Sequence, residues 1–198
     1  MNVRIKKTFG WYCGIVHQEK FSVNHCSTEL SMLTVVPDNE EQNIAYERMK
    51  FFVHGVLDDA ILISERSPLR EAYEKTGARL ICLPEEPVDQ IVGMMLYLKL
   101  NAIMENRIVV TDVEFWSKLG DSVSYLHSHG EGLGPFIDGG WWTDPRPCWQ
   151  TYQEKNPQDK VVSLDIIPEW KDHDLEWAND SDRGNSVVFA KFGKDENE

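Results

Sequence analysis

Alternating apolar and polar residues mark the first third of the chain as β-structure. The segments 3–17 and 20–36 place valine, isoleucine, phenylalanine and leucine at many alternate positions, with threonine and serine between them. A period of two residues is typical of strands that bury one face. With Gly14 or the segment 17–20 as the turn, these two segments predict a twisted antiparallel ribbon.

The apolar period lengthens to that of a helix after Pro37. Asp38 predicts a helix N-cap, and Glu41 stands three residues later, as in a capping box. Apolar residues follow at helical spacing and predict a helix that ends near residue 57. The short apolar run 60–64 then predicts a buried strand.

A second helix and strand follow the same scheme. The segment 67–77 has Ser67 as its cap, Pro68 at the first helical position and Gly77 at its end. The apolar run 78–83 predicts another strand. Alternation of strands and helices over this part of the chain indicates a layered sheet.

The most apolar helix is predicted over residues 87–105. Pro87 stands at its start beside acidic residues, which suits the first turn of a helix. Its apolar residues cover nearly the whole circumference, with Val88, Ile91 and Met95 on one stripe. A helix of this kind is either central to the core or half of a homodimer interface, and the pattern favours the core.

Two further strands are predicted over 107–117 and 121–128. The order of elements predicts an α/β (or α+β) domain: a mixed sheet with three helices, an N-terminal antiparallel ribbon and a long loop rich in tryptophan and glycine. Residues 1–150 are expected to form this single core domain. Residues 151–198 are expected to form an acidic C-terminal extension that packs on the core or follows it.

Charge narrows the classes of partner. The chain has 33 Asp and Glu against 20 Lys and Arg, a net charge of −13. Such a surface repels a phosphate backbone, so direct binding of nucleic acid is not expected. It suits a basic protein partner, or a nucleic-acid mimic in which carboxylates replace phosphates. Within the extension, the segments 160–167 and 185–192 predict edge strands.

The chain shows no signal-peptide core and no apolar run long enough to span a membrane, so a cytoplasmic protein is expected. Its four cysteines contain no CxxC pair, which argues against a zinc ribbon or a disulfide framework. Cys13 and Cys82 lie among apolar residues and are expected to be buried free thiols.

The run SYLHSH supplies the most distinctive candidate chemistry. His127 and His129 project from the same face if the segment is a strand, because side chains alternate with a period of two. Two imidazoles with a carboxylate from Glu131 or Asp138 are a ligand set that zinc accepts, and a bound divalent metal would activate water. Structural hydrogen bonding and metal-free acid–base work are the two other roles that fit the pair.

The run VSYLHSHG resembles the His-x-His strand of JAMM-type metalloproteases, which are zinc-dependent isopeptidases. That family follows its second histidine with a proline and then with a serine and an aspartate at fixed distances. Gly130, Ile137 and Gly140 occupy those three positions here. The chain is therefore not assigned to that family.

The segment 130–149 is the second candidate, with five glycines, three prolines and three tryptophans. A structureless loop of this length is typical of a lid, a ligand groove or a docking surface. Aromatic anchors among polar residues are what protein-binding surfaces use. The residues expected to bind the partner are the tryptophans of this loop and of the acidic segment that follows: Trp141, Trp142, Trp149, Trp170 and Trp177.

Paired carboxylates are the third candidate. Asp112 and Glu114 share one face of a predicted strand, and a neighbouring strand would bring them within reach of His127. The function favoured by the sequence is an acidic interaction or regulatory protein. A metal-dependent hydrolase centred on His127 and His129 is the alternative, and a nucleic-acid mimic is the third hypothesis.

Overall fold

The computed structural model describes residues 3–121, 123–150 and 168–178, and it shows an α+β fold with a six-stranded mixed sheet. The strands are β1 (Arg4–His17), β2 (Lys20–Thr34), β3 (Ile61–Ser64), β4 (Leu80–Leu83), β5 (Ile108–Ser117) and β6 (Tyr125–Ser128). The α-helices are α1 (Asn39–Lys50), α2 (Arg70–Glu74) and α3 (Asp89–Met104). None of the helices in these ranges is long and apolar enough to cross a membrane.

The predicted ribbon is confirmed. β1 and β2 pair antiparallel along their whole length, from Arg4 opposite Leu33 to His17 opposite Lys20. The turn falls within 17–20 and not at Gly14. Gln18 and Glu19 form it with φ angles of 50° and 60°. Positive φ at both central residues is the mark of a type I′ two-residue hairpin, whose twist matches that of the strands.

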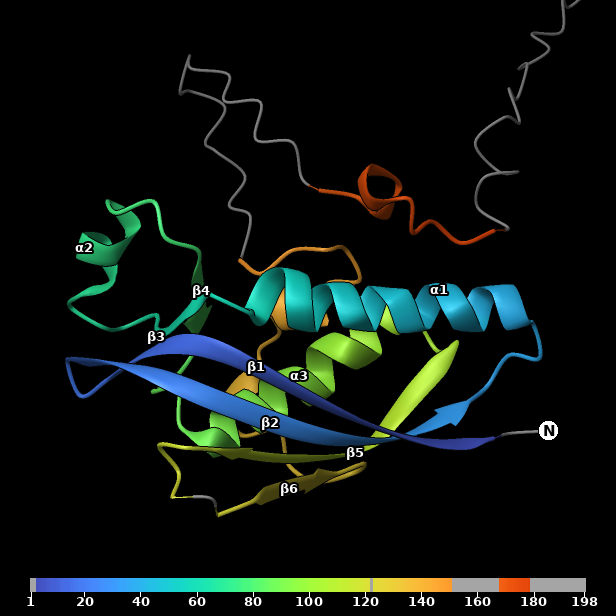
Figure 1. Cartoon of the computed structure of the whole chain (residues 1–198), viewed down its shortest axis with the longest axis horizontal. Coiled ribbons are helices and arrows are strands. Elements are labelled where there is room, and N and C mark those ends of the chain that lie inside the picture. The colour runs from blue at the N-terminus through green and yellow to red at the C-terminus, as the bar shows by residue number, and fades with distance from the viewer. Residues whose placement is uncertain (1–2, 122, 151–167, 179–198) are drawn as a thin grey trace, which may run out of the picture.

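The strand order is β4-β3-β1-β2-β5-β6 (Figure 1). β1, β3 and β4 run parallel to one another, whereas β2 and β6 run antiparallel to their neighbours. The carboxyl ends of the three parallel strands therefore meet at one edge of the sheet. In open sheets with parallel strands, ligands commonly bind at such an edge.

The first helix begins where the sequence predicts. The Asp38 side chain accepts hydrogen bonds from the N–H groups of Glu40 (2.7 Å) and Glu41 (3.2 Å), as an N-cap does. After α1 the chain continues as a π-helix, η1 (Phe51–Leu57). The predicted helix 67–77 is much shorter in the structure, where only Arg70–Glu74 (α2) is α-helical within that range. None of the residues of α2 is buried.

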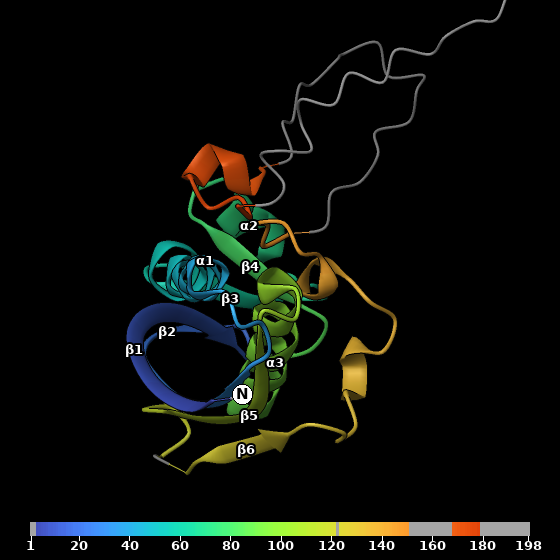
Figure 2. The same ribbon diagram turned by 90° about the vertical axis from the view of Figure 1, so that its right-hand side faces the viewer.

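α3 lies at the centre of the molecule, with β5 and β6 on one side and α1 on the other (Figures 1 and 2). Residues 91–97 of α3 are all buried by contacts within this one chain. This arrangement corresponds to the core interpretation of the helix. The four cysteines are free thiols; Cys82 is half-buried and the other three are buried.

The tryptophan-bearing part of the segment 130–149 packs onto α3, whereas residues 130–132 and 137–139 are exposed. Lys99, in the C-terminal half of α3, is fully buried, and burial lowers its pKa to about 8. Its ammonium group donates to the carbonyl oxygens of Trp141 (3.0 Å), Asp144 (2.7 Å) and Arg146 (2.9 Å). A buried charge needs such acceptors, so this contact fixes the loop against the core.

The described part of the C-terminal segment, residues 168–178, packs against α1. The guanidinium of Arg48 lies 4.6 Å from the ring centroid of Trp170 and 3.6 Å from that of Trp177. Its Nε donates to the carbonyl oxygen of Leu175 at 2.8 Å. The predicted strands 160–167 and 185–192 lie outside the described residues.

Replacing Lys99 with methionine tests the contact that fixes the loop. We expect Lys99→Met to lower the free energy of unfolding by about 3 kcal/mol, because three carbonyl oxygens lose their donor. The measurement is urea denaturation followed by tryptophan fluorescence. The control is Lys75→Met, which removes an exposed lysine paired with Glu71 and should change stability by less than about 0.5 kcal/mol. Equal stability of the two variants would contradict the structural role of Lys99.

Candidate functional site

The two histidines of the SYLHSH run both contact Tyr97 of α3. His127 is 1% exposed and its ring lies 4.7 Å from that of Tyr97, edge to face. His129 follows β6 and its Nδ1 lies 2.8 Å from the Tyr97 hydroxyl. The common face predicted for the pair is therefore confirmed, and Tyr97 is the side chain that both rings meet.

The carboxylates predicted to complete a metal site are placed unequally. Glu131 Oε2 lies 3.6 Å from His127 Nδ1, whereas Asp138 is exposed in the following segment and is not brought to the histidines by any contact. Within the described residues, no group of three or more His, Cys, Asp and Glu side chains is spaced to hold a metal ion. The geometry therefore gives the metal-dependent hydrolase no support.

The expectation that Asp112 and Glu114 approach His127 is wrong. In the β5–β6 ladder His127 pairs with Val113, so the two acids point to the opposite face of the sheet. Asp112 there accepts a hydrogen bond from the Ser128 hydroxyl at 2.7 Å. The reason is the alternation of side chains along β5. Asp112 and Glu114 flank Val113 and therefore lie on the face opposite to that of Val113 and His127.

The tryptophans expected to bind a partner are part of the core. Four of them are at most 7% exposed, and Trp149 is half-buried against the same core. The indole N–H of Trp141 donates to Cys82 O (3.0 Å), and that of Trp170 donates to Pro145 O (2.6 Å). The expectation of exposed aromatic anchors is therefore wrong for these residues: Trp141, Trp142, Trp170 and Trp177.

An apolar hollow of about 410 Å³ opens at the N-terminal end of α3. We call it the apolar hollow; its walls come from the end of β1, the start of α3 and the turn between β5 and β6. Three of its apolar side chains are exposed: Val88 (40%), Leu119 (52%) and Val123 (71%). The remaining lining residues are Ile15, His17, Pro87, Asp89, Gln90, Gly120, Ser124 and Tyr125.

Asp89 holds this hollow in shape. Its carboxylate accepts hydrogen bonds from the backbone N–H (3.0 Å) and the hydroxyl (2.6 Å) of Ser117, which joins the start of α3 to the end of β5. The backbone of Gly120 approaches so closely that an added Cβ would lie 2.1 Å from Asp89 Oδ2. A larger residue at this position would push the Asp89 carboxylate away from its Ser117 donors, so glycine here preserves the link between α3 and the turn that carries Leu119.

Val88 occupies a position where the helix would be more stable with another residue. It is the N-cap of α3, with extended backbone, and no side chain caps the first turn. Serine, threonine, aspartate and asparagine are favoured at an N-cap, and valine is among the poorest choices. An exposed valine here forgoes a stabilising hydrogen bond and supplies apolar surface to the hollow instead.

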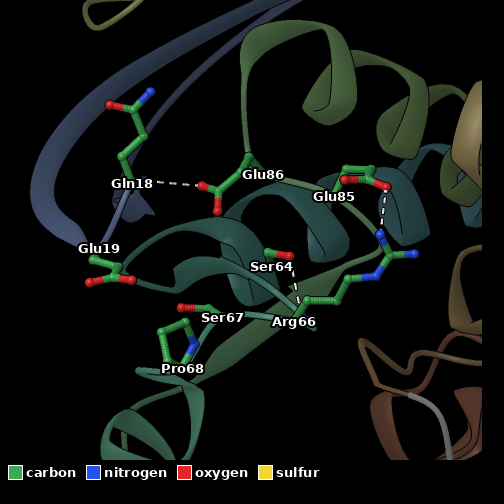
Figure 3. A pocket seen from close by; sticks show the side chains of 8 residues that line it. All are labelled: Gln18, Glu19, Ser64, Arg66, Ser67, Pro68, Glu85 and Glu86. Carbon is green, nitrogen blue, oxygen red and sulfur yellow. Dashed lines mark hydrogen bonds and ion pairs between the residues drawn. The ribbon is translucent and has the colours of Figure 1, made fainter.

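A second, polar hollow of about 390 Å³ lies beyond the carboxyl ends of β1, β3 and β4. We call it the acidic hollow. Figure 3 shows Gln18 beside Glu86 at one part of its wall and Arg66 beside Glu85 at another. The lining residues are Gln18, Glu19, Ser64, Arg66, Ser67, Pro68, Glu85 and Glu86.

The two hollows adjoin. His17 lines the apolar hollow and the next residue, Gln18, lines the acidic one. Likewise Glu86 lines the acidic hollow and Pro87 the apolar one. The backbone N–H of Gln18 donates to the Glu86 carboxylate at 3.2 Å, so a single hydrogen bond joins the two segments of the wall that they share.

Periodicity placed Val88 on the apolar stripe of the predicted helix 87–105 and did not single out Leu119 or Val123; two other signals mark these residues. In the structure Val88 is the N-cap of α3, where a capping residue is expected. Leu119 and Val123 are apolar residues in a turn between two strands, where polar residues are usual. Each signal is an apolar residue at a position whose local structure favours a polar one.

In comparisons with known proteins, no protein-family model and no curated protein matches the sequence. Among solved structures, an uncharacterised protein from Wolinella succinogenes is 14% identical, with a TM-score of 0.48 over 65% of this chain and 99% of that one.

Two further similar structures are 6-pyruvoyl tetrahydropterin synthases from Plasmodium. The Plasmodium vivax enzyme is 12% identical, with a TM-score of 0.42 over 64% of this chain and 97% of its own. The Plasmodium falciparum enzyme is 14% identical, with a TM-score of 0.40 over 64% and 96%. At these values the comparisons do not identify a function, so the function is inferred from this chain's own residues.

The buried histidine predicts a dependence of stability on pH. Burial lowers the pKa of His127 below its usual 6.5, while Glu131 opposes the shift. Because the unfolded chain then takes up the proton more readily, the stability is fully present above pH 6.5 and falls as the pH drops below it. We expect His127→Leu to reduce the loss of unfolding free energy between about pH 7.5 and 5.5.

Chemical denaturation at the two pH values measures this loss. The control is His54→Gln, which removes an exposed histidine and should leave the loss unchanged. An equal loss in wild type and His127→Leu would show that His127 does not carry the dependence.

The missing cap gives a second prediction. Val88→Ser should raise the free energy of unfolding by about 1 kcal/mol, because the serine hydroxyl accepts a hydrogen bond from the first turn of α3. Thermal and urea denaturation measure the gain. Val123→Ser, in the same hollow but outside any helix, should stay within about 0.5 kcal/mol of wild type. A destabilised Val88→Ser would mean that the valine is held by packing.

Proposed function

We propose that this protein is a binding protein that takes up a segment of a partner protein at the apolar hollow. The observation that carries the proposal is the convergence of Val88, Leu119 and Val123, all exposed, around one cavity of about 410 Å³. A central apolar pocket with a polar surround is the usual form of the energetically dominant part of a protein interface.

The loss of helix stability caused by valine at the N-cap position 88 supports the proposal. A capping side chain would stabilise α3, the central helix of the fold, yet the position holds an exposed apolar residue. Sequences accept a loss of stability most often where a functional surface requires it. The shape of the hollow is also fixed before binding, since Asp89 and Ser117 join its walls, and a preformed site loses less entropy when it binds.

The proposal keeps the function favoured by the sequence but moves the binding surface. The tryptophans pack in the core and supply little exposed surface. The exposed apolar residues lie at the opposite end of α3 from the residue 99 contact, beside acidic side chains. Nucleic-acid mimicry by the acidic surface stays a prediction.

Two leucines of similar exposure provide a matched test. Leu119 (52% exposed) lines the hollow, and Leu126 (56% exposed) lies on β6 outside it. Tagged wild type, Leu119→Asp and Leu126→Asp would be compared in affinity capture from the native host, with captured proteins quantified by mass spectrometry. We expect Leu119→Asp to lose a specific partner by at least about tenfold, because a buried unpaired charge opposes docking, and Leu126→Asp to retain it.

Circular dichroism and thermal denaturation would first establish that both variants fold, as expected for substitutions of exposed side chains. If both variants capture the same proteins as wild type, the hollow is not the binding surface. The same conclusion follows if Leu126→Asp alone loses the partner.

A further inference from the structure

The acidic hollow indicates the chemistry of the partner segment, on the condition that the proposed function holds. Three carboxylates, from Glu19, Glu85 and Glu86, line it together with one guanidinium, that of Arg66. Arg66 is committed to Glu85, with 3.1 Å between Nη1 and Oε1. The negative charge of Glu19 and Glu86 is therefore left without a cation among the residues that line this hollow.

Two serine hydroxyls also line this hollow. Ser64, at the end of β3, is 4% exposed, and its hydroxyl oxygen accepts the backbone N–H of Arg66 at 3.2 Å. Ser67 adds a second hydroxyl, and Figure 3 shows the Ser64 side chain beside Arg66, to which a dashed line joins it. Carboxylates and hydroxyls around an open space suit a group with several N–H donors and a positive charge.

A metal ion does not fit this hollow, since no group of three or more acidic, histidine or cysteine side chains in the described ranges is spaced to hold one. An ammonium or guanidinium group on a long side chain does fit. The ammonium of lysine ends a flexible stem and the guanidinium of arginine is planar, and each presents several N–H donors to the surrounding oxygens. Lysine and arginine are the residues that carry such groups.

The apolar and acidic hollows adjoin through consecutive residues, at His17–Gln18 and at Glu86–Pro87. An extended segment advances about 3.3 Å per residue, so a few residues span both. We propose that the partner's docking segment carries an apolar side chain that enters the apolar hollow and, within a few residues, a lysine or arginine that enters the acidic hollow. Charge complementarity with Glu19 and Glu86 selects this segment over an acidic or purely apolar one.

A peptide library displayed on phage tests the proposal without knowledge of the partner. The probe is a library of random dodecapeptides, selected on the folded full-length protein and counter-selected on Leu119→Asp. Enriched peptides are then synthesised, each with a matched version in which its lysine or arginine is glutamine. Dissociation constants are measured by fluorescence anisotropy.

The Glu19→Gln, Glu86→Gln double variant completes the test, because glutamine at 86 keeps an oxygen for the Gln18 N–H. We expect removal of the peptide's cation to weaken binding to wild type about tenfold, and to weaken binding to the double variant much less. Glu40→Gln with Glu47→Gln, on α1, removes the same charge at a distance and should leave the tenfold difference intact. Raising the salt concentration should reduce the difference in wild type.

The outcomes separate the two proposals. The inference about the segment is overturned, and the proposed function stands, in either of two cases. In the first, the selected peptides require the apolar hollow but are not enriched in basic residues. In the second, removing the peptide's cation weakens binding to wild type and to the double variant equally. If counter-selection on Leu119→Asp leaves no binders, or if the enriched peptides bind Leu119→Asp as tightly as wild type by anisotropy, the proposed function and the inference are overturned together.

Discussion

The buried ammonium group of Lys99 determines how the second half of the chain is arranged. It lies within the most apolar helix of the protein, where a charge is tolerated only if acceptors surround it. The segment 141–148 supplies three carbonyl oxygens and is thereby drawn onto α3. Trp141 is buried in the process, and Pro145 of the same segment accepts the hydrogen bond of Trp170, so the C-terminal segment is held as well.

Much of the fold could be predicted from the sequence. The ribbon, the cap at Asp38, the strand at 60–64 and the central helix all depend on local periodicity and capping, which a single sequence records. The burial of Trp141 and its neighbours in the segment 141–148 could not be predicted. It depends on one lysine whose acceptors lie more than 40 residues away along the chain, and nothing in the local pattern of 130–149 distinguishes an exposed aromatic loop from a buried one.

The candidate site was missed for a related reason. The SYLHSH run drew attention because two histidines share a face, yet the structure uses that face to pack them on Tyr97. The hollows are formed by segments far apart in the sequence, at the ends of β1, β3 and β4 and the start of α3. Their signature is an apolar residue at a capping position and two more in a turn, which is visible only when each residue is compared with what its local structure favours.

Site-specific photo-crosslinking tests most directly where the partner binds. A benzophenone side chain would be introduced in place of Val123, at the apolar hollow, or of Thr143, an exposed residue beside the buried tryptophans. The account predicts that irradiation in the native host crosslinks a partner protein to position 123 and not to position 143. A crosslink from position 143 alone would place the interface on the tryptophan loop and contradict the account.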